Sequence, residues 1–122
     1  MDIDTTSTVP IFQQIVDGVC AAVAAGVYRP GDLVPSIRQQ AVRLLVNPNT
    51  VQRAYEHLER EGMLVSRRGS GMEVTTDARE AAARRVAESV RGTFATGIEA
   101  GKAAKLARGA IDGLYRKAWN GE

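Results

Sequence analysis

The chain has 122 residues, with sixteen Lys and Arg against fourteen Asp and Glu, and it contains one cysteine. This length favours one domain with at most a small appendage, and an apolar share of 44% argues against intrinsic disorder. The single cysteine excludes an intramolecular disulfide and a cysteine-based zinc site. The acidic first residues argue against a signal peptide, and no apolar run approaches the roughly 20 residues of a membrane span. We therefore expect a soluble, cytoplasmic protein with no membrane partner.

The first predicted helix covers residues 11–25. Its apolar residues recur at spacings of three and four and form one stripe: Phe12, Ile15, Val16, Val19 and Val23. Gly26 and the turn-forming stretch 29–32 then end it.

Two further helices follow, separated by a short turn. Ser36 is a good N-cap for a helix to about residue 45, with Gln39 as its capping-box partner. Asn47 and Pro48 suit the N-cap and first position of a third helix, which reaches about residue 61. The apolar face of the third helix consists of Val51, Ala54, Tyr55 and Leu58.

After the third helix, the spacing of apolar residues changes from that of a helix to that of a strand. Residues 64–66 and 72–75 are typical of two short strands, and the glycine-containing stretch 67–71 between them indicates a hairpin with a basic tip. From Asp77 the composition shifts to Ala, Arg and Glu. We expect one tail helix that contains Val86, Val90 and Phe94 and is interrupted at Gly97, then another over residues 100–119.

This order of elements predicts a mainly α fold with a small β-hairpin. The predicted domains are a winged helix-turn-helix in residues 1–76 and a two-helix hairpin in residues 77–122. In such a motif one helix enters the major groove of DNA with its N-terminal residues toward the base edges. Burial of the apolar face of the third helix turns outward Asn49, Gln52, Arg53 and Glu56. Asn and Gln pair with adenine, and Arg pairs with guanine.

Local charge supports the same interpretation although net charge does not. Residues 1–76 carry a net charge of −1 and residues 77–122 carry +3. Between Arg29 and Arg53, however, there are four arginines and one acid, and the hairpin tip adds Arg67 and Arg68. The start of the third helix, at Asn47 and Thr50, offers backbone N–H groups to a phosphate. The predicted partner is therefore double-stranded DNA, bound by the first domain.

Over residues 9–74 the chain resembles the GntR family of bacterial repressors, and within it the short YtrA-like branch. The motifs that carry the resemblance are PGD at 30–32, PSIR at 35–38, NPNTV at 47–51, RAY at 53–55, LEREG at 58–62 and RRGSG at 67–71. The resemblance implies a dimeric DNA-binding transcription factor in which Arg38 contacts the phosphate backbone, residues 47–52 face the major groove, and Gly69 lets the wing tip enter the minor groove. The predicted DNA-binding residues are Ser36, Arg38, Asn47, Asn49, Thr50, Gln52, Arg53, Arg67, Arg68 and Gly69.

Two positions depart from the family pattern. Gln40 stands on the buried face of the second helix, where the family usually has an apolar residue. Leu45 stands where a glycine usually makes the turn into the third helix. A leucine held in the left-handed region would cost about 1–2 kcal/mol, so we expect either another turn geometry or stored strain.

The tail predicts self-association. Two helices of about 20 residues have no third element of their own to cover both apolar faces, whereas two copies make a four-helix arrangement. The predicted dimerisation residues are Val86, Val90, Phe94, Leu106, Ala110 and Leu114. The predicted function is a homodimeric repressor acting on a two-fold operator.

Other functions fit the residues less well. One histidine, no cysteine pair and no phosphate-binding glycine motif give no catalytic or metal-binding constellation, so we expect neither an enzyme nor a cofactor. A winged helix that binds protein without nucleic acid is the main alternative, and double-stranded RNA binding is a weaker one. A steep loss of affinity with salt would distinguish a DNA binder from the protein-binding alternative. The sequence does not identify a small-molecule effector or the operator.

Overall fold

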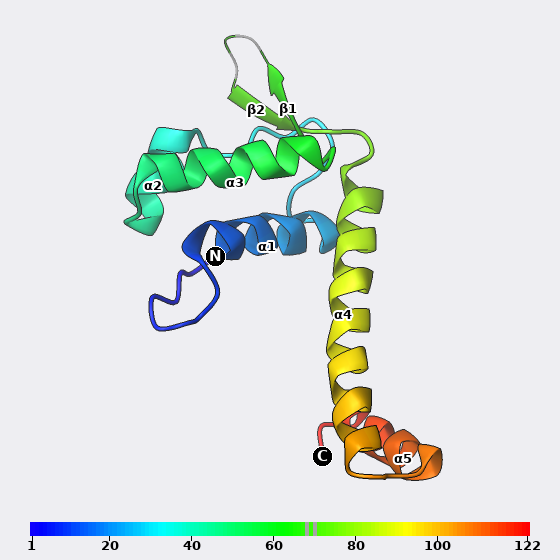
Figure 1. Cartoon of the computed structure of the whole chain (residues 1–122). Helices are drawn as coiled ribbons and strands as arrows, with labels where there is room; N and C mark the ends of the chain where they lie inside the picture. Colours follow the sequence, from blue (N-terminus) through cyan, green and yellow to red (C-terminus); the bar gives the residue numbers. More distant parts are fainter. Residues whose placement is uncertain (68, 70) are drawn as a thin grey trace. The chain divides into compact units, whose positions relative to one another are not determined.

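The computed structural model of the chain describes residues 1–67, 69 and 71–122. Its elements are α1 (Ile11–Ala24), α2 (Ile37–Leu44), α3 (Pro48–Arg60), β1 (Leu64–Arg67), β2 (Gly71–Val74), α4 (Ala78–Ala103) and α5 (Arg108–Trp119) (Figure 1). The mainly α class with a small hairpin is confirmed. The chain folds as two compact units, residues 1–86 and 87–122. Across the described residues, no helix has both the length and the apolar character needed to cross a bilayer.

The core of the first unit lies where α3 meets its neighbours. α3 packs on α1 and α2, and β1 packs on α3 (Figure 1). Each helix contributes the apolar stripe that its spacing predicts, and the half-buried ring of Phe12 packs at the edge of this core. The residues of this core that are 0% exposed are Ile15, Val16, Val51, Ala54, Leu58, Met63, Ala78 and Ala82. The burial of one face of α3 therefore leaves the opposite face free.

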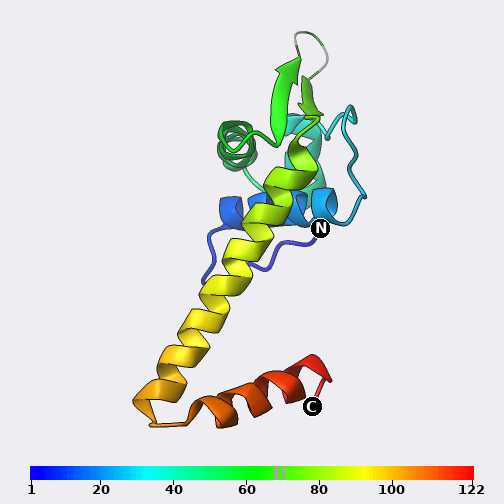
Figure 2. The same ribbon diagram turned by 90° about the vertical axis from the view of Figure 1, so that its right-hand side faces the viewer.

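The hairpin forms a wing beside this core. β1 and β2 pair antiparallel with Leu64 opposite Val74 and Arg67 opposite Gly71. The segment before α2 extends the pairing, because the Val34 N–H donates to the Met72 carbonyl at 3.0 Å and the Val74 N–H donates to the Asp32 carbonyl at 2.9 Å. Figure 2 shows the two strands projecting from the helices of the first unit.

The predicted starts of α2 and α3 are confirmed. The Ser36 Oγ accepts from the Gln39 N–H, and the Gln39 side chain accepts from the Ser36 N–H, which completes the capping box. At the start of α3 the Asn47 Oδ1 accepts from the Asn49 N–H at 2.8 Å, and Pro48 occupies the first helical position. These local bonds fix where α2 and α3 begin.

In the turn between α2 and α3, Leu45 adopts the strained left-handed conformation, which was one of the two alternatives expected from the sequence. Leu45 has φ 58° and ψ 46°, in the left-handed region. Its side chain is 90% exposed, so burial of the leucine does not offset the cost of this conformation. The strained residue sits immediately after α2 and two residues before the N-cap of α3.

Within the first unit, an ion cluster joins the beginning of α4 to α1 and to the end of α3. The Arg85 guanidinium donates to the Glu61 Oε1 at 2.6 Å and to the Asp17 Oδ1 at 3.3 Å. His57, which is half-buried, lies 2.8 Å from the same Glu61 oxygen. Residues from α1, from α3 with its C-cap, and from α4 therefore meet at one arginine. The buried alanines of α4 all belong to this unit: Ala78, Ala81 and Ala82.

The predicted break in the tail at Gly97 is wrong. α4 continues through Gly97 to Ala103, because an interior glycine costs only about 1 kcal/mol and does not by itself end a helix. The chain turns instead at residues 104–107, where Lys105 has φ 62°. Leu106 therefore lies in the turn, not on the second tail helix as predicted. A Cβ on Gly101 would stand 3.0 Å from the Ile111 Cδ1, so this glycine allows α5 to pack closely on α4.

We expect Leu45→Gly to raise the free energy of unfolding by about 0.5–1 kcal/mol. Glycine adopts the left-handed region without steric cost, and its greater freedom in the unfolded chain offsets part of that gain. Urea unfolding followed by circular dichroism measures the change. Val42→Gly is the control, because Val42 is 71% exposed within α2, and there glycine should lower stability by about 1 kcal/mol. Destabilisation by both variants would show that Leu45 is not strained.

Candidate nucleic-acid interface

The free face of α3 carries the predicted base-reading residues. Asn49, Gln52 and Arg53 are exposed, while their neighbours Val51 and Ala54 are buried. Asn47 is also exposed and Thr50 is half-buried at the start of the helix. The outward and inward faces are therefore as predicted, and the polar groups lie toward the N-terminal half of α3.

One of these polar side chains already has a partner. The Gln52 Nε2 donates to the Glu56 Oε1 at 3.1 Å, one helical turn further along α3. This bond uses an N–H donor of the amide and leaves the carbonyl oxygen of Gln52 outside the contact. An amide that reads adenine needs both a donor and an acceptor, so base readout by Gln52 requires exchange of the Glu56 contact.

Arg53 is held by an aromatic ring from a different helix. Its Cζ lies 3.8 Å from the centre of the Phe12 ring, at the start of α1. The two residues share an open hollow of about 410 Å³ with Asn49 and Thr50. The stacked guanidinium keeps its N–H groups at the edge of the ring, so it can still donate to a base or a phosphate.

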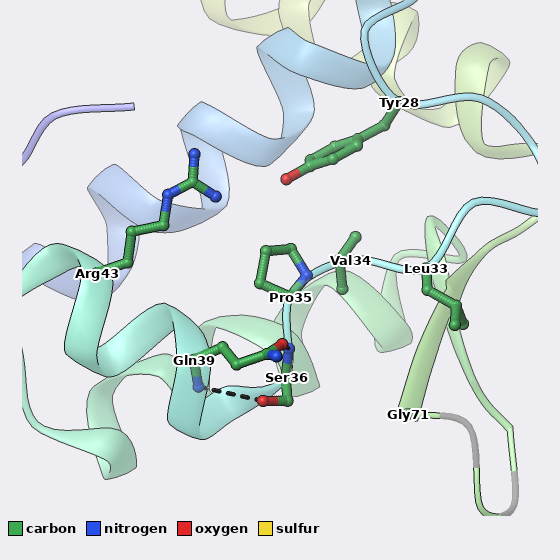
Figure 3. A pocket seen from close by; sticks show the side chains of 8 residues that line it. All are labelled: Tyr28, Leu33, Val34, Pro35, Ser36, Gln39, Arg43 and Gly71. Carbon is green, nitrogen blue, oxygen red and sulfur yellow. Dashed lines mark hydrogen bonds between the residues drawn. The ribbon is translucent and has the colours of Figure 1, made fainter.

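Ser36 and Arg38 lie at the beginning of α2, and both are exposed. Figure 3 shows the Ser36 hydroxyl accepting the bond from the Gln39 backbone at the edge of a hollow of about 630 Å³ between α2 and β2. The Arg38 guanidinium forms no ion pair with any residue that the structure describes. This end of α2 therefore presents one positive charge and a helix N-terminus to an anion.

The wing contributes one arginine and one glycine within the described residues. Arg67 is 59% exposed at its side chain, and its Nε donates to the Glu73 carboxylate across the hairpin. Gly69 has φ 80°, a conformation that other residues rarely adopt. Among the described residues, no heavy atom lies within 4 Å of a Cβ built there, so none of them blocks a close approach to Gly69. The prediction for Arg68 falls outside the described residues.

A buried tyrosine fixes α3 against the segment before α2. The Tyr55 hydroxyl donates to the Pro35 carbonyl at 2.7 Å, and the side chain is 2% exposed. Burial, with a smaller contribution from Tyr28, raises the pKa of the Tyr55 phenol, so the hydroxyl remains a donor at physiological pH. This bond joins α3 to the loop that leads into Ser36 and Arg38.

Two features of this surface were not predicted from sequence: the ring beneath Arg53 and the Glu73 partner of Arg67. The Arg85 cluster, at the other end of α3, was not predicted either. Phe12 and Arg53 lie on different helices, and no local spacing connects them. The alternating strands do place Arg67 and Glu73 on one face of the hairpin, so a register drawn from the sequence could have suggested that pair.

Comparisons with known proteins match the part of the chain that carries this surface. The family model described as "Bacterial regulatory proteins, gntR family" matches residues 11–74, which include α1 to β2. The HTH-type transcriptional repressor YtrA of Bacillus subtilis is 39% identical over 79 residues, or 65% of this chain and 61% of that protein. The match thus spans about three fifths of the length of this relative.

Solved structures resemble nearly the whole chain. A GntR family transcriptional regulator from Listeria monocytogenes superposes with a TM-score of 0.78 at 30% identity, covering 94% of this chain and 98% of that one. YtrA from Sulfolobus acidocaldarius, a GntR-family transcription factor, has a TM-score of 0.60 at 29% identity, and the match covers 98% of this chain and 97% of that one. The fold is therefore a winged helix-turn-helix followed by a helical tail.

We expect the Phe12–Arg53 contact to contribute about 0.5–1 kcal/mol to stability, as cation–π pairs near a surface do. A double-mutant cycle with Phe12→Leu and Arg53→Gln measures the coupling from urea unfolding. Phe12→Leu combined with Arg60→Gln is the control cycle, because Arg60 lies at the far end of α3. Equal coupling in the two cycles would mean that the ring does not hold Arg53 in solution.

Proposed function

Because the chain belongs to the GntR family of bacterial regulatory proteins, we propose that it is a transcriptional repressor that binds a two-fold DNA operator as a homodimer. The family is one of regulators rather than enzymes, and the proposed place of action is the cytoplasm, where the DNA lies. The observation that carries the proposal is α3, a short helix with one face fully buried and with amide and guanidinium groups on the other.

The proposed division of roles follows from the chemistry of each element. Asn49, Gln52 and Arg53 read base edges in the major groove. Ser36, Arg38 and the first N–H groups of α3 at Asn47 and Thr50 bind the phosphate backbone and set the register of the protein on the duplex. The wing, with Arg67, Arg68 and Gly69, approaches the neighbouring minor groove.

The second unit supports the dimer. All of residues 87–122 are described, and none of them is buried. Phe94 is 50% exposed and Leu114 is 55% exposed, although they are large apolar residues. Phe94 contacts Tyr115 edge to face at 5.9 Å between ring centres, so aromatic groups from both helices share one surface. The exposed apolar residues of the tail are Val86, Val90, Phe94, Ile98, Leu106, Leu114, Tyr115 and Trp119.

A second copy of the tail is the occupant that this apolar surface fits best. An open hollow of about 370 Å³ between α4 and α5 is lined by Phe94, Ile98, Leu114 and Tyr115 among others. A two-fold axis would place the same residues of a partner against it and exclude water from both faces. Of the predicted dimerisation residues, Phe94, Leu106 and Leu114 line this hollow, whereas Val86, Val90 and Ala110 are exposed and do not line it.

Selection of bound sequences from a random duplex pool, using the full chain, tests DNA reading directly. We expect a sequence with two inverted half-sites. Gln52→Ala and Asn49→Ala should each cost about 1–3 kcal/mol at particular base pairs, whereas Arg38→Ala should weaken all duplexes about equally. Arg38→Ala should also lower the slope of log affinity against log salt by about 0.9, the value for one phosphate contact.

Arg60→Ala is the matched control, because it removes an exposed arginine from the far end of α3. It should leave base preference unchanged, and it should change the slope of log affinity against log salt by less than the value for one phosphate contact. Two results together would contradict the proposed function and favour a protein-binding role. The selection would yield no enriched sequence, and neither the Asn49 and Gln52 variants nor the Arg38 variant would change the affinity for DNA.

We expect Phe94→Lys and Leu114→Lys to convert a dimer to a monomer. A charge at either position would be buried without a partner in the proposed interface. Sedimentation equilibrium of the full chain measures the mass, and Val42→Lys in the first unit is the control for adding a charge at an exposed valine. The monomeric variants should also bind the two-fold site more weakly than a dimer, because linkage of the two half-sites is lost. A wild-type chain that stays monomeric at high concentration would exclude the dimer.

A further inference from the structure

An aromatic ring, and no acidic residue among those described, holds the side chain of Arg53. Its Cζ lies 3.8 Å from the centre of the Phe12 ring, inside the distance of about 6 Å at which a cation is attracted to an aromatic face. No carboxylate in the described part of the chain forms an ion pair with Arg53. Arg53 is nevertheless exposed on the free face of α3. The ring is therefore the contact that restricts the direction of this long side chain.

The core of the first unit fixes the ring in turn. Phe12 is half-buried near the start of α1, and it packs against the apolar residues of that core. α1 lies alongside α3, which brings the ring under the exposed arginine (Figure 1). Side chains packed against a core keep defined rotamers, so Phe12 gives Arg53 a fixed surface.

Two other polar side chains of the proposed DNA-binding surface are held by acids. The Gln52 Nε2 donates to the Glu56 Oε1, and the Arg67 Nε donates to the Glu73 carboxylate. Each of these contacts takes up an N–H donor, so it must be exchanged before that donor can bind DNA. A ring face takes up no N–H donor in this way, because the five N–H groups of a guanidinium lie in its plane. Arg53 can therefore stay on the ring while it binds.

We propose that Phe12 is a positioning residue for base recognition, which orders Arg53 to read one guanine in each half-site of the operator. The inference rests on the proposed function of the chain. Arginine reads guanine with two N–H groups that reach O6 and N7 together, so the plane of the guanidinium must be set. Ordering a free arginine on DNA weakens binding about three- to tenfold. Because the ring orders Arg53 before DNA binds, the contact with guanine avoids this loss.

Two other roles for these residues lead to different results. If Phe12 only fills the edge of the core, its replacement should change stability and leave base preference unchanged. If Arg53 binds a phosphate, its replacement should weaken all duplexes about equally, as proposed for Arg38. Base preference therefore separates the proposal from both.

The contact between the ring and the arginine is tested first on the full chain without DNA. In ¹H–¹⁵N spectra, the ring current of Phe12 should displace the Nε–H signal of Arg53 from the position of an exposed arginine. Phe12→Leu should abolish this displacement, whereas Phe12→Tyr keeps an aromatic face and should preserve it. An Arg53 signal that is the same in the wild type and in Phe12→Leu would overturn the proposal, whatever the chain does with DNA.

Base recognition is then measured by competition between the selected operator and duplexes with single base pairs changed. Arg53→Ala identifies the guanine that Arg53 reads, as the base pair at which discrimination is lost. Phe12→Leu should lower discrimination at that base pair about three- to tenfold. Discrimination at the base pairs read by Asn49 and Gln52 should not change, nor should the slope of log affinity against log salt, because no charge is removed. Phe12→Tyr should discriminate as the wild type does.

A double variant shows whether the ring acts through the arginine. In a chain that already carries Arg53→Ala, Phe12→Leu should cause no further loss of discrimination. Circular dichroism checks that each variant is folded. If Phe12→Leu does not fold, Phe12→Met replaces it, because methionine fills irregular space at a core without presenting a ring face.

Three results overturn the proposal and leave the proposed function standing, because in each of them the wild type still selects an operator. Discrimination at the Arg53 base pair could be unchanged without the ring. The loss caused by Phe12→Leu could be as large in the Arg53→Ala chain as in the wild type. Arg53→Ala could weaken all duplexes about equally. A wild-type chain that selects no sequence would instead remove both the proposed function and the role of Phe12.

Discussion

The arrangement of the first unit depends on the burial of one face of α3. Val51, Ala54, Tyr55 and Leu58 recur at helical spacing and fill the space against α1, α2 and β1. Because an α-helix has 3.6 residues per turn, burial of these positions forces Asn49, Gln52 and Arg53 outward. The Tyr55–Pro35 hydrogen bond then sets the rotation of α3 relative to the loop before α2. One packing interaction thus determines both the core and the face that the duplex is proposed to meet.

Features set by local chemistry were predictable from the sequence. The Ser36 capping box, the Asn47 cap, Pro48 at the first helical position and the glycine-containing hairpin each follow from a few adjacent residues. The fold class followed from their order. The outward face of the predicted reading helix followed as well, because its apolar positions keep a strict helical period. That these outward residues contact DNA remains a prediction.

Features set by long-range contacts or by near-balanced energies were not predictable. Arg85 meets Glu61 and Asp17 from 24 and 68 residues away, and nothing local in the sequence pairs them. The prediction of a helix break at Gly97 misplaces the end of α4, because a glycine does not by itself end a helix. The cost of an interior glycine is small, and the role of Gly101 is spatial: it admits Ile111 of α5. A glycine pattern alone does not distinguish a stop from a close contact.

The two positions where α2 departs from local rules lie five residues apart, and both bear on α3. Gln40 buries a side-chain oxygen that accepts no hydrogen bond among the described residues, and Leu45 holds a left-handed backbone without burying its side chain. Each departure lowers stability, and neither is compensated by a contact among the described residues. Sequences that satisfy local rules elsewhere tend to break them where function requires it. Gln40 lies within α2 and Leu45 directly follows it, so both departures stand in the short segment that leads into α3. Because Leu45 connects the two helices, a change in its backbone conformation would alter how α3 is presented.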